Sequence, residues 1–214
     1  MPRYLFALVL FMLTAASANA AFLSRQSGQA YYDTVLNITW LADANYAQTS
    51  LYDGDGRMDW PGAQAWIASL NAANHLGASA WRLPTTVQPD PSCAGQFDPG
   101  FPYPIQGFSV GCTGSEMGHL FNLGGVTSAT PSPFANVKPD LYWSDTTVSW
   151  STARAWAFDF NTGGQNTLFK SSFSVYAWAV LDGDALAVVP VPAAVWLLGS
   201  ALAGLGILRR RAIA

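Results

Sequence analysis

The stretch Trp81-Arg82-Leu83-Pro84-Thr85 constrains the fold more than any other part of the sequence. A short apolar run that stops at a proline predicts a buried strand, because proline cannot continue the hydrogen-bond ladder of a sheet. A long segment rich in proline and glycine follows it, from residue 86 to 114, and contains both cysteines. The strand should therefore lie in the core, with a functional loop beginning at its end.

The first twenty residues predict a secretory signal peptide. Arg3 precedes an apolar run from Tyr4 to Leu13, and Ala18-Asn19-Ala20 has the small-x-small pattern of a cleavage site. Ten apolar residues are too few to cross a bilayer. We expect the mature chain to begin at Ala21 and to be exported.

The other end of the chain predicts a membrane segment. A linker at 185–192 contains Val189-Pro190-Val191-Pro192, residues 193–208 are apolar or small, and residues 209–214 begin with Arg209, Arg210 and Arg211. As a helix, the apolar run would be about 24 Å long, which spans a bilayer if it thins or the flanking residues snorkel. The arginines should stay in the cytoplasm and leave the domain outside. A buried core helix is the alternative, which three terminal arginines disfavour.

Residues 21–184 are expected to form the folded domain. They contain six basic and 13 acidic residues, a formal charge of −7, which opposes binding to nucleic acid. Eight of the nine tryptophans lie here. Tryptophan can fill a core or line a surface that stacks on sugars, and for any single one the core is favoured.

Export makes the cysteine count informative. Cys93 and Cys112 are the only pair, and a disulfide between them would close a loop of about 20 residues and contribute roughly 3 kcal/mol. Free thiols or a metal site are the alternatives. A zinc set is disfavoured because His119 stands seven residues beyond Cys112 and no fourth ligand accompanies it.

The remaining pattern predicts an α+β domain with two helices and antiparallel strands. Apolar residues at helical spacing predict a helix from Pro61 to about Ala73 or Asn74, and a shorter helix follows Ser115, which could cap it. The segment 43–50 reads as a loop. Strands are expected at 30–32, 37–41, 141–144, 155–160 and 174–181.

Asp53, Asp55 and Asp59 alternate with glycine and offer carboxylates that could hold calcium, the one cofactor the sequence suggests. The full EF-hand pattern needs a further acidic position before the glycine and a glutamate at its end, and both are absent. The alternative is a turn in which Asp59 caps the next helix. His75 and His119 have no partners in sequence that indicate catalysis.

The tail resembles a PEP-CTERM sorting signal in its Val-Pro-x-Pro-Ala form, residues 189–193, followed by a helix and basic residues. It departs from the Pro-Glu-Pro form. The resemblance implies a Gram-negative envelope protein whose tail an exosortase recognises and cleaves, in bacteria that make exopolysaccharide or biofilm matrix.

Several short segments occur in an order that is typical of one known domain family. They are 32–33, 36–46, 55–58, 81–85, 115–120, 142–144, 155–156 and 176–180. Through them, residues 28–184 resemble the Lcl C-terminal-domain family. The resemblance implies a single domain with a C-type-lectin-like fold, related in shape to the formylglycine-generating enzyme. Leu181 stands where that family usually has arginine.

Gln88-Pro89-Asp90 has the form of a calcium-dependent galactose motif in C-type lectins, and Trp143-Ser144-Asp145 faintly echoes its partner motif. The separation of 53 residues from Asp90 to Trp143 is long for that pair. A proline turn is the favoured interpretation.

We therefore expect an exported, non-catalytic lectin-like module that binds matrix polysaccharide or another surface macromolecule. It would be anchored in the inner membrane facing the periplasm, or processed to the cell surface or extracellular matrix. A structural matrix component is the alternative. An enzyme of the formylglycine-generating type is disfavoured, since that chemistry needs a reactive cysteine pair.

Overall fold

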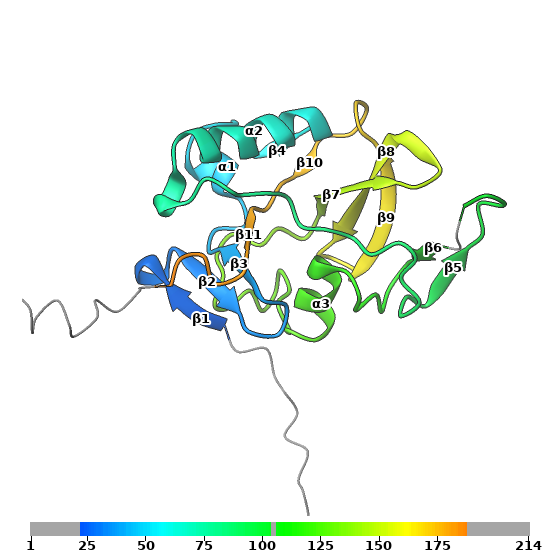
Figure 1. The fold of residues 1–214 in the computed structure, drawn as a ribbon, viewed down its shortest axis with the longest axis horizontal. Coiled ribbons are helices and arrows are strands. Elements are labelled where there is room, and N and C mark those ends of the chain that lie inside the picture. The colour runs from blue at the N-terminus through cyan, green and yellow to red at the C-terminus, as the bar shows by residue number, and fades with distance from the viewer. Residues whose placement is uncertain (1–21, 104–105, 188–214) are drawn as a thin grey trace, which may run out of the picture.

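A computed structural model describes residues 22–103 and 106–187 (Figure 1). The predicted signal peptide, sorting motif, apolar segment 193–208 and terminal arginines lie outside these residues. Within the described ranges, no helix is long and apolar enough to cross a membrane. The domain is a mixed α+β structure whose strands pair mostly antiparallel.

The first sheet has the strand order β1-β2-β3-β11. Its strands are β1 (Phe22–Arg25), β2 (Ala30–Asp33), β3 (Ile38–Leu41) and β11 (Val180–Asp182). The predicted hairpin is confirmed, because β2 pairs antiparallel with β3 from Ala30–Leu41 to Asp33–Ile38. The strand β1 was not predicted from the sequence. Leu181, at the family's arginine position, is buried in β11 opposite Thr39.

The second sheet has the order β4-β10-β7-β8-β9. The predicted single strand at 174–181 is wrong: β10 joins this sheet, whereas β11 belongs to the first. The end of the domain therefore ties the two sheets together. The strands of the second sheet are β4 (Arg57–Met58), β7 (Leu141–Val148), β8 (Ser151–Asp159), β9 (Gly164–Phe169) and β10 (Val175–Tyr176).

The segment from Trp81 to Thr85 is buried but is not a regular strand. Its only bridge joins Arg82 to Val180, through two backbone hydrogen bonds of 2.9 Å. Trp81 and Leu83 are 2% and 0% exposed, so the predicted central position is confirmed. Pro84 has no N–H with which to extend the ladder.

The described residues contain three α-helices, one more than was predicted for the domain. They are α1 (Tyr46–Thr49), α2 (Trp60–Ala72) and α3 (Glu116–Asn122), and short 3₁₀ helices occupy Gln26–Gly28 and His75–Gly77. Helix α1 falls in the segment expected to be a loop, and its single turn gives too short a periodic pattern to detect. Ser115 precedes α3, but its side chain does not cap it.

Aromatic side chains fill the space between the two sheets. Trp40, Trp143 and Trp178 are wholly buried, and the Trp40 and Trp178 ring centroids lie 5.1 Å apart. The indole N–H of Trp143 donates to the Met58 carbonyl and that of Trp178 to the Leu41 carbonyl, whereas the Trp40 N–H has no partner among the described residues. Most of the central tryptophans therefore serve packing, as predicted.

Candidate functional site

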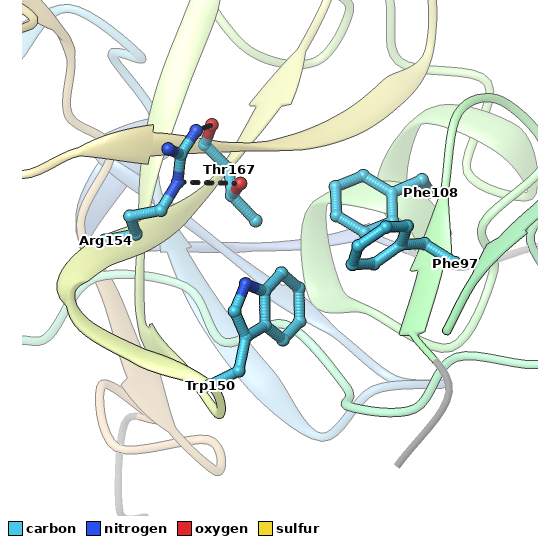
Figure 2. Close-up of a pocket in the computed structure, with 5 residues that line it drawn as sticks. All are labelled: Phe97, Phe108, Trp150, Arg154 and Thr167. Atoms are coloured by element: carbon cyan, nitrogen blue, oxygen red, sulfur yellow. Dashed lines mark hydrogen bonds between the residues drawn. The ribbon is translucent and has the colours of Figure 1, made fainter. Parts of the chain in front are cut away.

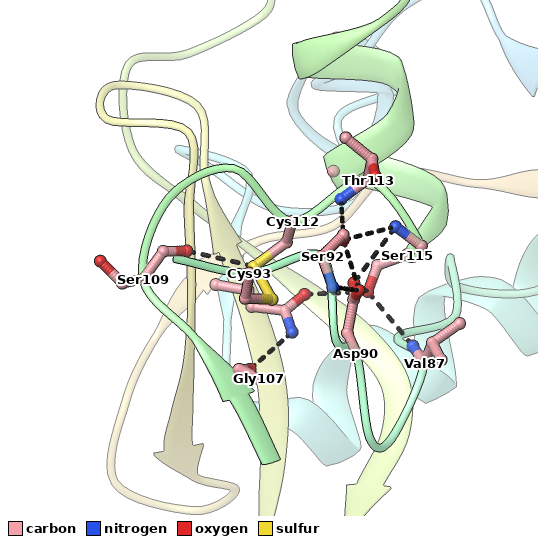
Figure 3. Close-up of a disulfide and its surroundings, with 12 residues drawn as sticks. Val87, Asp90, Ser92, Cys93, Gly107, Ser109, Cys112, Thr113 and Ser115 are labelled. Atoms are coloured by element: carbon pink, nitrogen blue, oxygen red, sulfur yellow. Dashed lines mark hydrogen bonds between the residues drawn. A yellow bond between two sulfur atoms is a disulfide. The ribbon is translucent and has the colours of Figure 1, made fainter. Parts of the chain in front are cut away.

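A disulfide closes the long loop that follows residue 85. Cys93 is bonded to Cys112, 19 residues away, as the sequence predicted (Figure 3). The enclosed segment is not irregular throughout, because β5 (Gly95–Phe97) and β6 (Gln106–Phe108) form an antiparallel hairpin inside it. The hairpin gives the loop a defined shape on which side chains can be positioned.

Asp90 holds the base of this loop. Its carboxylate is 0% exposed; Oδ1 accepts from the Ser92 N–H at 3.1 Å and from the Ser92 hydroxyl, and Oδ2 accepts from the Gly114 N–H at 3.2 Å. The Ser115 hydroxyl lies 3.3 Å from the same oxygen (Figure 3). Asp90 therefore joins both ends of the loop beside the disulfide and is not an open ligand.

Gln88 binds the turn between β7 and β8 and not the disulfide loop that Asp90 holds. Its Oε1 accepts from the Ser149 N–H at 2.9 Å, and its Nε2 donates to the Thr147 carbonyl at 2.7 Å. Gln88 thus fixes the turn between β7 and β8, whereas Asp90 fixes the disulfide loop. In the second predicted motif, Trp143-Ser144-Asp145, the Trp143 side chain is buried, and Asp145 Oδ1 accepts a hydrogen bond from the Gln64 side chain at 2.6 Å. The residues of the predicted sugar site therefore bind different parts of the fold and do not come together as one site.

Gln165 docks the hairpin onto the edge of the second sheet. Its backbone exchanges hydrogen bonds of 3.1 and 2.9 Å with Ser109, and its Nε2 donates to the Gly107 carbonyl at 2.7 Å. The Ser115 hydroxyl donates to Gln165 Oε1 at 2.8 Å, which explains why it does not cap α3. Gln165 is 2% exposed, so this junction is fixed inside the protein.

The hairpin and the edge of the sheet enclose a hollow of about 350 Å³ (Figure 2). We call it the aromatic hollow. One side carries rings from two sources, the disulfide loop and the β7–β8 turn, and the other side carries a guanidinium and a hydroxyl from β8 and β9. Its lining residues are Phe97, Phe108, Trp150, Arg154 and Thr167.

The rings of the aromatic hollow pack against one another and against a buried tryptophan. The Phe97 centroid lies 5.7 Å from that of Phe108 and 5.6 Å from that of Trp150. Phe108 in turn packs at 4.8 Å against Trp156, which is 0% exposed. Phe97 remains 47% exposed, and Phe108 and Trp150 are half-buried. The hollow therefore carries partly exposed aromatic rings that pack on a buried tryptophan.

Arg154 supplies the charge of the aromatic hollow. Its Nε donates to the Thr167 hydroxyl at 3.3 Å and its Nη2 to the Thr167 carbonyl at 3.1 Å, while the guanidinium lies 4.2 Å over the Phe169 ring. Among the described residues, its guanidinium is not in any ion pair, in contrast to Arg25, Arg57 and Arg82. It is held in place with its positive charge uncompensated.

The carboxylates of the predicted calcium triad do not converge. Asp59 Oδ1 accepts from the Gly62 N–H at 2.8 Å, so this residue caps α2, as the alternative interpretation held. Asp53 and Asp55 lie in the preceding turn and accept from backbone N–H groups. Partial burial acts to raise the pKa of Asp53, but the N–H groups of Asp55 and Gly56 and the neighbouring Asp55 side chain lower it overall.

The cysteines and the two histidines lie apart from the aromatic hollow. Both cysteines are bonded to each other and are 6% and 0% exposed. His75 stacks on Tyr46 at a centroid distance of 4.7 Å, and burial lowers the pKa of its imidazole. His119 is 8% exposed within α3. None of these groups lines the aromatic hollow.

Sequence analysis did not identify the aromatic hollow. Phe97 and Phe108 flank the centre of the disulfide loop, and Trp150 lies in the β7–β8 turn, so neither periodicity nor a motif connects them. A usable signal was present, because aromatic residues in a segment expected to be an exposed loop indicate binding. Comparison with family models, with curated proteins and with solved structures finds no match.

Proposed function

We propose that this chain is an exported envelope or extracellular protein whose domain binds matrix polysaccharide in the aromatic hollow, without catalysis. The observation that carries the proposal is the set of three partly exposed rings beside the Arg154 guanidinium, which has no ion-pair partner in the described part of the chain. Signal and tail patterns in the sequence support export, and a sorting tail of this type would be recognised by an exosortase in the membrane.

Sugars suit such a surface for two reasons. The C–H faces of a pyranose ring are apolar and can pack on an aromatic face, whereas its hydroxyls need polar partners at the edge. Phe97 and Trp150 supply the faces, and Arg154 supplies N–H donors that can meet hydroxyl or carboxylate oxygens. A hollow of about 350 Å³ also falls within the roughly 300–1,000 Å³ of small-ligand sites.

The position of the aromatic hollow favours a long ligand over a free sugar. It is open and lies where the hairpin projects beyond the edge strand β9 (Figures 1 and 2). A few sugar units of a polysaccharide could lie in such an open site while the polymer continues on both sides. The rest of the polymer would remain outside, as binding to a matrix requires.

The test is titration of the full chain, purified in detergent, with three soluble polymers: a neutral β-glucan, a polyuronate and a sulfated glucan. We expect saturable binding to at least one, and a Phe97→Ala variant should weaken it by about tenfold, or about 1.4 kcal/mol. An Arg154→Gln variant decides whether charge contributes, because only binding to an acidic polymer should fall steeply. Binding that Phe97→Ala leaves unchanged would place the site elsewhere and contradict the proposal.

A further inference from the structure

The loop between α1 and α2 follows the frame of a calcium-binding EF-hand loop with two ligand positions missing. In that twelve-residue frame, the third and fifth positions give side-chain oxygens and the sixth is glycine. Counting from Leu51, these positions are Asp53, Asp55 and Gly56. The first and twelfth positions, where carboxylates are expected, are occupied by Leu51 and Gly62.

The two acidic side chains of this loop are fixed by backbone N–H groups. Asp53 Oδ1 accepts from the N–H groups of Asp55 and Gly56 at 3.1 and 2.8 Å, and Asp55 Oδ1 accepts from the Arg57 N–H at 2.9 Å. All three of these hydrogen bonds reach an Oδ1 atom, and the Asp55 side chain also lies within hydrogen-bonding reach of Asp53. Arg57 does not neutralise them through an ion pair, because its guanidinium is paired with Asp140 at 2.7 Å.

An independent observation comes from Asn45. Its side-chain Nδ2 donates to Gln48 Oε1 at 2.7 Å, but its Oδ1 is buried and accepts no hydrogen bond from the described residues. The residue is 2% exposed, and Oδ1 lies against Gly56: a Cβ there would be 1.9 Å from it. A buried amide oxygen without a donor is unfavourable unless something electropositive meets it.

We propose that Asp53, Asp55 and Asn45 bind a calcium ion. Asn45 would supply the oxygen that the first loop position lacks, and water would complete the six to eight oxygen ligands that calcium takes. Gly56, at φ +79°, allows the turn and leaves the space that Asn45 occupies. The site differs from the sequence prediction, because Asn45 replaces Asp59, and it does not depend on polysaccharide binding.

Calcium titration of the full chain after chelator treatment tests the site by calorimetry. We expect a dissociation constant of about 10⁻⁴–10⁻³ M, as in extracellular calcium modules. Asp53→Asn and Asp55→Asn keep an oxygen for the backbone N–H groups but lose charge, and each should weaken binding about tenfold. Asp98→Asn is the matched control: Asp98 makes the same kind of turn, to the Gly100 N–H at 2.8 Å, in the disulfide loop and not in the proposed calcium loop.

A second variant distinguishes a lost ligand from a damaged fold. Asn45→Asp adds a carboxylate at the proposed ligand position and should tighten calcium binding severalfold, which a destabilised loop cannot do. No calcium heat from the wild-type chain up to about 10 mM, ten times the weakest expected constant, would overturn the proposal. Equal weakening in Asp98→Asn, or no gain in Asn45→Asp, would do the same.

Discussion

The core between the two sheets and the aromatic hollow are built from the same residue types and differ in what covers them. Trp40 and Trp178 lie between two sheets and are 0% exposed. Trp150 lies in the β7–β8 turn and Phe97 in the hairpin closed by the disulfide, and both side chains remain partly exposed. Aromatic content alone therefore does not tell packing from binding; the covering element decides.

The polar groups of the two regions differ in the same way. In the core, the indole N–H groups of Trp143 and Trp178 donate to the carbonyls of Met58 and Leu41, whereas the Trp40 N–H has no partner among the described residues. At the aromatic hollow, the Arg154 guanidinium is oriented by Thr167 and has no anionic partner among the described residues. A satisfied polar group stabilises the fold, whereas an oriented group with remaining donors is available to a ligand.

The largest expected effect comes from the core. Trp178→Ala removes a side chain in edge-to-face contact with Trp40 and Phe134, and we expect a loss of about 3–5 kcal/mol in the free energy of unfolding. Urea unfolding measures it. Trp178→Phe should retain more of that free energy; a loss below about 1 kcal/mol for Trp178→Ala would mean that the core is not organised as described.

The disulfide should matter next, and it should affect both properties. Replacing Cys93 and Cys112 by alanine removes the constraint on a loop with a 19-residue separation, at a cost of about 3 kcal/mol. Because Phe97 and Phe108 lie inside that loop, polysaccharide binding should fall with it. Unfolding by urea and titration with the polymer that binds wild type measure the two effects. Reductant is the control, because it should change neither the stability nor the binding of a double variant that lacks the disulfide. If the double variant bound the polymer as the wild type does, the hollow would not depend on the disulfide loop.

Trp150→Ala should have a smaller effect on stability. The side chain is already half-buried and lies in a turn, so we expect a loss of about 1 kcal/mol or less in the unfolding free energy. Urea unfolding beside Trp178→Ala makes the comparison direct. Equal losses in the two variants would remove the distinction between packing and binding aromatics.

The smallest effect concerns the edge of the first sheet. The hydrogen bonds from Arg25 lower the pKa of Asp184, against a smaller effect of burial, so this pair stabilises the fold above the unfolded pKa of about 3.9. The contribution disappears as the pH falls through the lower folded value. Since the pair is partly exposed, we expect at most about 1 kcal/mol. Arg25→Gln should flatten that part of the pH–stability profile, and an unchanged profile would contradict the assignment.

The sequence predicted those features that depend on local pattern. Helix α2, its Asp59 cap, the β2–β3 hairpin and the disulfide follow from periodicity, capping chemistry and cysteine count. The split of residues 174–181 between two sheets could not be foreseen, because both halves are apolar and β-prone. The same limit applies to Trp81–Thr85, whose burial was predicted but whose pairing with β11 through the single bridge Arg82–Val180 depends on the topology.

The candidate site was harder to predict than the fold. Gln88 and Asp90 were weighed as a linear sugar-binding motif, with a proline turn favoured, and their side chains bind different segments. The aromatic hollow draws on residues up to 70 positions apart, from Phe97 to Thr167, and sequence pattern does not indicate that β5 and β9 lie together. Asn45 could not be connected with Asp53 because a missed helix, α1, separates them.

The most direct test of the distinction is the affinity of Trp150→Ala for the polymer that binds the wild-type chain. Phe173→Ala is the control, since Phe173 is an aromatic residue 44% exposed that does not line the aromatic hollow. The account predicts at least tenfold weaker binding for Trp150→Ala, about 1.4 kcal/mol, with the fold intact, and wild-type affinity for Phe173→Ala. Wild-type affinity in Trp150→Ala would contradict it.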